Sequence, residues 1–188
     1  VSYLSKQPLD GTQMGCSIVV YDWGSDTWGE PVRICDSGTR ADTHFFPSLC
    51  IDNAGYIHIF YGCHGSTGVK YRRSSNPADV SSWTAESTLM YQCTYPIGIV
   101  IPANASVNSN RIYCISRGGW PSPFDGDDHY SFCYSDNNGT SWSGPKRFII
   151  DTDHPGAKMY VYGVRFDPDE ERLHVAWTWQ QSDIAPLG

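Results

Sequence analysis

Four side chains of types that can move a proton beside a bound anion stand out in the sequence: His44, His64, Tyr95 and Arg117. A histidine is a base near neutral pH because its unperturbed pKa lies at about 6.5. A tyrosine hydroxyl can donate or accept a proton, and an arginine binds a carboxylate through two parallel hydrogen bonds. Together these types suit acid–base catalysis beside a bound anionic group.

The positions of these residues along the chain predict that they lie near one another in pairs. His44 and Tyr95 each stand where the first strand of an expected four-strand unit begins. His64 and Arg117 each stand where the second strand of such a unit ends. Consecutive antiparallel strands run in opposite directions, so the start of the first strand lies beside the end of the second. The sequence therefore places the four residues, two by two, at equivalent corners of adjacent units.

The elements that must position them are short strands. Apolar or alternating runs separated by turn residues recur along the chain, and helical periodicity is almost absent. Aromatic residues make up 14% of the sequence and charged residues only 18%, a composition that suits strands joined by turns. The expected strands are 16–23, 31–36, 47–52, 56–62, 69–74, 83–90, 95–101, 111–118, 129–136, 144–151, 159–167 and 172–180.

These strands recur in units of roughly 45–55 residues with four strands each, which is the pattern of β-propeller blades. We predict an all-β fold, a β-propeller that is present here as a partial propeller of about three to four blades. The expected blade-like units, all parts of one domain, are 1–42, 43–90, 91–151 and a truncated 152–188. Because a closed propeller needs at least four blades, the missing blades imply the remainder of a longer chain or self-association.

One turn supports the blade interpretation. Ser135-Asp-Asn-Asn-Gly-Thr-Ser-Trp142 resembles the Asp-box turn between the third and fourth strands of sialidase-type blades, with Asn137 in place of the aspartate. The segment from Ser75 to Trp83 occupies the matching place in the preceding unit in a degenerate form. Such a turn is structural, so it reports the position within a blade and not catalysis.

The segment from His44 to Trp142 resembles the BNR-repeat-containing family that includes the ulvan lyases. The matching elements are Thr43-His-Phe-Phe-Pro47, Ile51-Asp-Asn-Ala-Gly-Tyr-Ile-His58, Gly62-Cys-His64, Thr94-Tyr-Pro96 and Arg117-Gly-Gly. The resemblance implies a seven-bladed propeller that cleaves sulfated, uronate-containing polysaccharide by β-elimination. It implies that His44 is the base, that Tyr95 is the acid, or the reverse, and that Arg117 and His64 neutralise the uronate carboxylate.

Further residues could bind the polymer. Lys70 and Arg72 form a basic spot in an otherwise acidic chain, and Trp120 could stack on a sugar ring. The alternative for Lys70 and Arg72 is a strand edge that charge keeps soluble. A structural role also remains open for each of the four site residues, for example as a packed aromatic or a loop cap.

Two other functions remain open at this stage. The first is a non-catalytic glycan-binding or structural propeller segment that assembles with other chains. The second is a sialidase-like glycoside hydrolase, which would need an arginine where Phe46 stands. A nucleic-acid partner is disfavoured by the net charge of −7, and no apolar run approaches the roughly 20 residues of a membrane span.

The remaining motifs concern the cell compartment and bound ions. The seven cysteines contain no C-x-x-C pair, so buried thiols and disulfides both remain open. Two N-glycosylation sequons begin at Asn104 and Asn138 and, with a glycan as the expected partner, favour a secreted or extracellular protein. No cofactor is required and no metal ligands are assigned, although the acidic loop Asp125–His129 could hold calcium, and a structural zinc also stays open.

Overall fold

The computed structural model describes residues 2–6, 14–36, 43–62, 64, 68–118, 129–150 and 157–181. Apart from one 3-10 turn, η1 (Thr43–Phe45), all regular elements among these residues are strands, and none is a helix long enough to cross a membrane. The strands are β1 Ser2–Lys6, β2 Met14–Ile18, β3 Tyr21–Asp22, β4 Thr27–Trp28, β5 Val32–Asp36, β6 Ser48–Ile51, β7 Ile57–Tyr61, β8 Val69–Arg73, β9 Ser87–Met90, β10 Cys93–Val100, β11 Ile112–Gly118, β12 His129–Ser135, β13 Lys146–Ile150, β14 Ala157–Asp167 and β15 Arg172–Gln181.

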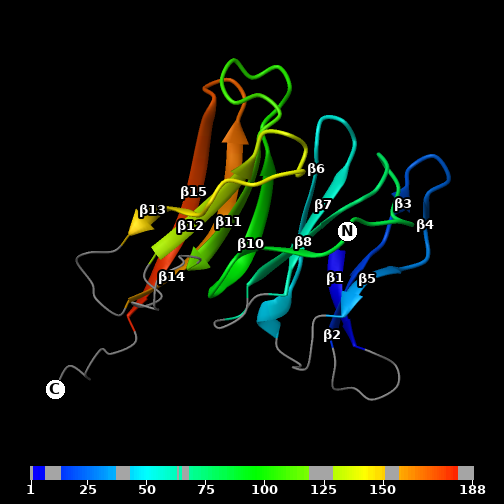
Figure 1. Cartoon of the computed structure of the whole chain (residues 1–188), viewed down its shortest axis with the longest axis horizontal. Helices are drawn as coiled ribbons and strands as arrows, with labels where there is room; N and C mark the ends of the chain where they lie inside the picture. The colour runs from blue at the N-terminus through cyan, green and yellow to red at the C-terminus, as the bar shows by residue number, and fades with distance from the viewer. Residues whose placement is uncertain are drawn as a thin grey trace.

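The strands form antiparallel sheets in which neighbours in sequence are neighbours in space. The orders are β1-β2-β5, β6-β7-β8-β9, β10-β11-β12-β13 and β14-β15, with β3-β4 as a separate small hairpin. Figure 1 shows these sheets side by side in chain order, from the blue β1-β2-β5 sheet to the orange and red β14-β15 pair. Meandering sheets arranged in this way are propeller blades. The prediction of an all-β partial propeller is confirmed.

The apolar core is divided between the sheets. One cluster joins β2 and β5 to β7, a second joins β7 and β8 to β11 and β12, and a third joins β11 and β12 to Met159 of β14. All five residues of β7 are buried, because a middle strand of a blade is covered by neighbouring blades on both faces. The blades are therefore held face to face by apolar burial, and hydrogen bonds hold the strands within each blade.

The turn that resembles an Asp-box ties two blades together. Within the turn, Asn137 Oδ1 accepts a hydrogen bond of 2.9 Å from the Ser141 N–H, and the Gly139 N–H donates one of 2.9 Å to Ser135 Oγ. Gly139 has a φ of +75°, and a side chain there would collide with the Tyr71 hydroxyl of the preceding blade. Arg73 reaches from that blade and donates to the Asn138 carbonyl at 2.6 Å. Both the φ value and the close approach thus require glycine at 139.

The structure adds strands that the sequence pattern does not predict, β1 and β4 among them. The expected strand 16–23 is interrupted: β2 ends at Ile18 and β3 covers Tyr21–Asp22. The break arises because Asp22 Oδ1 accepts a hydrogen bond of 2.7 Å from the Gly24 N–H, which turns the chain into the β3-β4 hairpin. The expected unit boundaries remain a proposal, with β6-β9 inside 43–90 and β10-β13 inside 91–151.

Candidate active site

His44 and His64 meet at one end of the β6-β9 sheet. His44 lies in η1, which precedes β6, and His64 follows β7. Their rings stack with centroids 4.0 Å apart and an interplanar angle of 13°. Both side chains are half-buried, and Phe45 packs edge-on against His64 with centroids 6.2 Å apart. The two residues lie together, as predicted, because β6 and β7 are antiparallel and the start of β6 lies beside the end of β7.

Tyr95 brings the next blade to this histidine pair. Its ring lies 5.6 Å from that of His44, centroid to centroid. Tyr95 has a φ of +59°, in the left-handed region, at a register shift between Thr94 and Ile97 where β10 pairs with β11. A bulge of this kind redirects a side chain out of the regular alternation, and a non-glycine residue in that conformation costs about 1–3 kcal/mol. The strain therefore coincides with the residue that joins the two blades.

Arg117 also lies beside Tyr95. Its guanidinium carbon is 5.1 Å from the centroid of the Tyr95 ring and 4.8 Å from that of Tyr160. The side chain is only 7% exposed, and its Nη1 has no hydrogen-bond partner within the described part of the chain. A buried cationic N–H group without an acceptor is costly, and a carboxylate is the group that would satisfy it best.

Two tyrosines that the sequence analysis did not select complete the cluster. The rings of Tyr160, in β14, and Tyr95 are 5.8 Å apart between centroids. Tyr130 is opposite Arg117 in the β11-β12 register, and its hydroxyl accepts a hydrogen bond of 2.7 Å from the Val161 N–H. Burial raises the pKa of Tyr130 to about 12, so its hydroxyl stays protonated. Tyr160 could have been found from its place near the start of the following unit, which corresponds to that of Tyr95.

A groove of about 600 Å³ adjoins this cluster. It runs between the start of β6, the start of β10 and β14, and Tyr95 and Tyr160 line it. The other lining residues are Phe46, Pro47, Ser48, Pro96, Ile97, Val161 and Tyr162. Aromatic and apolar walls with a few polar groups are typical of sites that bind a sugar ring edge-on or face-on. Of the four predicted residues, Tyr95 lines the groove, and His44 and Arg117 contact the Tyr95 ring. These residues form one candidate site at the junction of three sheets.

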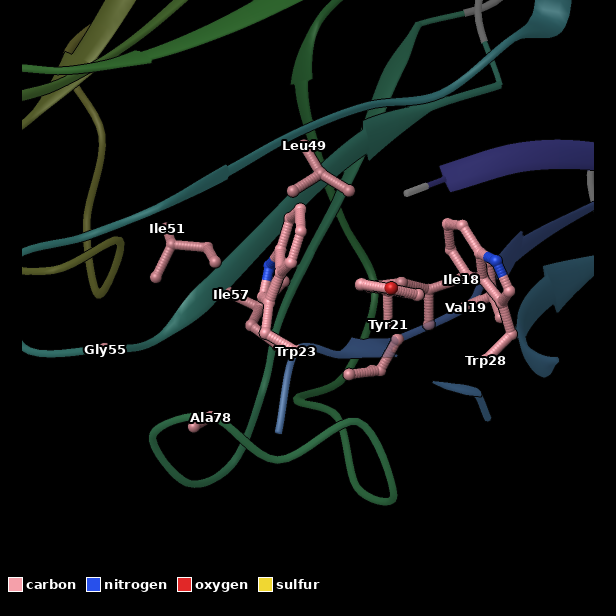
Figure 2. A pocket seen from close by; sticks show the side chains of 11 residues that line it. Ile18, Val19, Tyr21, Trp23, Trp28, Leu49, Ile51, Gly55, Ile57 and Ala78 are labelled. Carbon is pink, nitrogen blue, oxygen red and sulfur yellow. The ribbon is translucent and has the colours of Figure 1, made fainter. Parts of the chain in front are cut away.

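A larger pocket, of about 760 Å³, lies elsewhere and has different chemistry. Figure 2 shows Trp23 and Trp28 beside the β3-β4 hairpin, together with Leu49, Ile51 and Ile57 from β6 and β7. These last two residues lie at the turn end of the β6-β7 hairpin, opposite the end that carries His44. The polar side-chain groups of the lining are the Tyr21 hydroxyl and the indole N–H groups of Trp23 and Trp28, so the pocket offers no acid–base pair.

The three residues predicted to bind substrate are not all described. Trp120 lies outside the described residues, as do residues 125–128 of the acidic loop. Lys70 donates a hydrogen bond of 2.8 Å to Thr88 Oγ1 and lies 3.5 Å from Glu86. Arg72 lines a separate pocket with Arg33 and Glu86. A role for Lys70, Arg72 and Trp120 in substrate binding therefore stays a prediction.

One group of potential metal ligands occurs in the described ranges. Asp167, Glu170 and His174 lie at the turn between β14 and β15, with ligand atoms within 4.8 Å of one another. Asp167 Oδ1 accepts hydrogen bonds from the Asp169 and Glu170 N–H groups, which lower the pKa of that carboxyl. The carboxylate is thus already used to close the turn.

The family of the chain follows from its sequence as a whole. The family model described as "BNR repeat-containing family member" matches residues 15–185. The chain belongs to the BNR repeat-containing family. The match includes His44, His64, Tyr95, Arg117 and Tyr160.

Two named proteins are similar in sequence to this BNR-repeat chain. It is 27% identical over 170 residues to "Ulvan Lyase-PL25" of Pseudoalteromonas sp. (strain PLSV), covering 79% of this chain and 32% of that protein. It is 29% identical over 170 residues to "Ulvan lyase" of Alteromonas sp. (strain LOR), with the same shares. The chain thus spans about a third of the length of these relatives.

Solved structures give the same fold. A structure of an ulvan lyase described as a new family of polysaccharide lyase superposes with a TM-score of 0.58 at 25% identity, covering 79% of this chain and 38% of that one. A second structure of that type superposes with a TM-score of 0.64 at 23% identity, covering 88% of this chain and 40% of that one. The BNR-repeat chain therefore has the same fold as about two fifths of each of these structures.

Proposed function

We propose that the protein containing this chain is a polysaccharide lyase that cleaves a uronate-containing, ulvan-like polymer by β-elimination. The observation that carries the proposal is Arg117, a buried cation whose Nη1 has no partner in the described residues. It stands beside Tyr95 and Tyr160, and Tyr95 in turn contacts His44. An anion-binding group next to two proton-transfer groups is what elimination from a uronate needs.

The reaction begins with loss of the proton at C5 of the uronate, next to the carboxylate. His44 accepts this proton, and charge develops on the carboxylate oxygens as the C5–H electrons move toward the carboxyl carbon. Arg117 and His64 stabilise that charge, Arg117 through its guanidinium N–H groups. The C4–O bond then breaks, and the Tyr95 hydroxyl gives its proton to the departing glycosidic oxygen. The products are a new chain end and a C4–C5 double bond, and the proton balance is restored by solvent.

The roles of base and acid can be divided in two ways. The rings of His44 and Tyr95 are 5.6 Å apart between centroids, which supports a proposal that uses both groups on one sugar. In the reverse assignment, ionised Tyr95 takes the C5 proton and protonated His44 supplies the leaving group. In either assignment Arg117, whose guanidinium carbon is 5.1 Å from the centroid of the Tyr95 ring, keeps its role beside the carboxylate.

The named relatives support the substrate class. Both curated relatives are ulvan lyases, and one structure with the same fold is described as bound to -[GlcA(1-4)Rha3S]-. A glucuronate linked to a sulfated rhamnose has the carboxylate that the proposed mechanism needs. We propose Lys70, Arg72 and Trp120 as contacts to neighbouring sugars, and a secreted or extracellular location because the proposed substrate is a polysaccharide.

The experiment is a direct assay on purified protein. Incubation with ulvan and with other uronate polymers should produce ultraviolet absorbance from the new double bond conjugated to the carboxylate. His44→Ala should abolish most of this signal, and His174→Ala serves as the matched control because His174 is an exposed histidine on β15. Equal loss of activity in both variants would refute a specific role for His44.

The other outcomes distinguish the alternative functions. New reducing ends without the absorbance would indicate hydrolysis, as in a sialidase-like enzyme. Retention of the polymer without any product would indicate a glycan-binding propeller. Either result, obtained with a folded protein on the full panel of uronate polymers, would overturn the lyase proposal.

A further inference from the structure

Cys16 and Cys35 lie directly opposite each other on neighbouring strands. They are register partners in the antiparallel pair of β2 and β5, and both are reduced. Their side chains are hydrogen-bonded to each other. Residues that oppose each other in an antiparallel pair point to the same face with Cβ atoms about 4.5–5.5 Å apart. That spacing needs only a small adjustment to reach the separation that a disulfide spans.

The two thiols differ in accessibility. Cys16 is completely buried, whereas Cys35 is 8% exposed. Cys35 also lines a pocket of about 440 Å³ together with Arg33, Ile34, Arg72 and Glu86. A reagent from solution can therefore reach the pair only through Cys35.

The two thiols also differ in acidity. The hydrogen bond from Cys16 lowers the pKa of Cys35 and outweighs the opposing effect of burial. The pKa of Cys16 is raised, first by the same hydrogen bond and then by burial. The thiolate is the nucleophile in disulfide exchange, so the accessible Cys35 is also the reactive one.

The pocket in front of Cys35 has a specific charge. Arg33 and Arg72 contribute two guanidinium groups against the one carboxylate of Glu86. Arg72 Nε is buried and has no hydrogen-bond partner among the described residues. A molecule that carries carboxylates would pair with the Arg33 and Arg72 side chains that line the pocket, because guanidinium and carboxylate groups match in geometry.

We propose that Cys16 and Cys35 are a thiol–disulfide exchange site for a small disulfide that carries carboxylates, such as oxidised glutathione. The Cys35 thiolate attacks one sulfur of that disulfide, forming a mixed disulfide and releasing one thiolate, which takes up a proton. Cys16 then loses its proton and attacks Cys35 Sγ, which releases the second thiol and leaves a Cys16–Cys35 disulfide. The two cysteines are oxidised by two electrons, and the small disulfide is reduced to two thiols.

The disulfide would act on the strand that leads to the candidate active site. It would join β5 to β2, and β5 is the strand that precedes η1 with His44. The inference about Cys16 and Cys35 rests on the geometry of the two thiols and does not depend on the proposed lyase activity. Cys114 and Cys133 provide an internal comparison, since they also oppose each other, in β11 and β12, but both are completely buried.

The test begins with protein that has been reduced and freed of reductant. It is incubated folded with oxidised glutathione, quenched with N-ethylmaleimide and mapped by peptide mass spectrometry. We expect a peptide pair linked through Cys16 and Cys35, whereas Cys133→Ser should leave that link unchanged. Cys16→Ser should accumulate glutathione on Cys35, and Cys35→Ser should leave Cys16 unmodified. Closing the loop of residues 17–34 should raise the melting temperature by about 6–12 °C in the wild type and in Cys133→Ser, and should not do so in Cys16→Ser or Cys35→Ser.

A second comparison tests the pocket. Arg72→Gln should slow cross-linking by oxidised glutathione at least about threefold, yet leave cross-linking by an uncharged hydroxyethyl disulfide unchanged. Failure to link Cys16 with Cys35 in folded wild type would overturn the proposal. So would modification of Cys16 before Cys35, or equal reactivity of Cys114 and Cys133. Equal slowing of both reagents by Arg72→Gln would refute the carboxylate-binding pocket.

Discussion

Two histidine–tyrosine sites occupy opposite ends of the same sheet and differ in what surrounds them. At the turn end of β6-β7, His58 is completely buried, with Nε2 3.1 Å from Asp52 Oδ2 and Nδ1 2.8 Å from the Tyr71 hydroxyl. At the other end, half-buried His44 contacts His64 and Tyr95. The first site contains a carboxylate, and the second has the cation of Arg117 behind its tyrosine. Similar residue types thus form a closed structural site at one end and an anion-binding candidate at the other.

The comparison teaches that partners decide the role of a histidine more than its neighbours in sequence do. Both ring nitrogens of His58 have protein partners, and burial lowers the pKa of His58 below its ordinary value. Neutral His58 therefore donates from Nε2 to Asp52 and accepts from Tyr71, which fixes its tautomer. A group held in this way stabilises the fold, whereas proton transfer to a substrate needs a group beside a groove.

The largest effect is expected for the proposed base. His44→Ala should lower kcat/KM on a uronate polymer by about 10²–10⁴-fold, because the general base is lost. The melting temperature should change little, since the side chain is half-buried and lies in η1. Steady-state rates and thermal unfolding measured on the same preparation check both parts. A variant that keeps its rate would remove the distinction between the two histidine sites.

The next largest effect is expected for the anion-binding group. Arg117→Lys keeps the positive charge but loses the forked N–H geometry, and kcat/KM should fall by about 10²–10³-fold. Arg172→Lys is the matched control, because Arg172 is an exposed arginine at the start of β15. The proposed role is contradicted if Arg117→Lys and Arg172→Lys have the same kinetic constants.

A stability effect is expected at the structural end. Gly139→Ala should lower the free energy of unfolding by about 1–3 kcal/mol, because the backbone has a positive φ and the new methyl group meets the Tyr71 hydroxyl. Gly144→Ala is the control, since nothing lies within 4 Å of a Cβ built there. Urea denaturation compares the two. Similar urea midpoints for Gly139→Ala and Gly144→Ala would show that a side chain at position 139 does not clash with the Tyr71 hydroxyl.

The smallest effect is expected in the pH dependence of stability. The pKa of His58 is lowered in the folded state from its ordinary value of 6.5, so the unfolded chain binds more protons as the pH falls below that value. Its contribution to stability is present above that pH and is lost as the pH falls toward the folded-state pKa. His58→Gln should reduce this acid-side slope, as measured by unfolding between neutral and mildly acidic pH. An unchanged slope would mean that His58 is not held neutral by burial.

Much of the fold follows from local sequence, because strand periodicity and turn residues act over a few residues. The β6-β7 hairpin is an example: Asp52 Oδ1 accepts hydrogen bonds from the Ala54 and Tyr56 N–H groups within its own turn. The β3-β4 hairpin was missed because the alternating pattern continues through Val19 and Val20, while the break depends on the Asp22 turn.

For the candidate site, the order of strands along the chain was enough to pair His44 with His64 and Tyr95 with Arg117. The sequence by itself determined this because the strands of a blade alternate in direction. Only the packing of β14 against β10 and β11 decided that Tyr160 lies against Tyr95 and over Arg117. The burial of Arg117 and the contact between His44 and Tyr95 likewise depend on neighbouring blades. Contacts between blades form across the apolar interface of separate sheets, and no short-range pattern encodes which residues meet there.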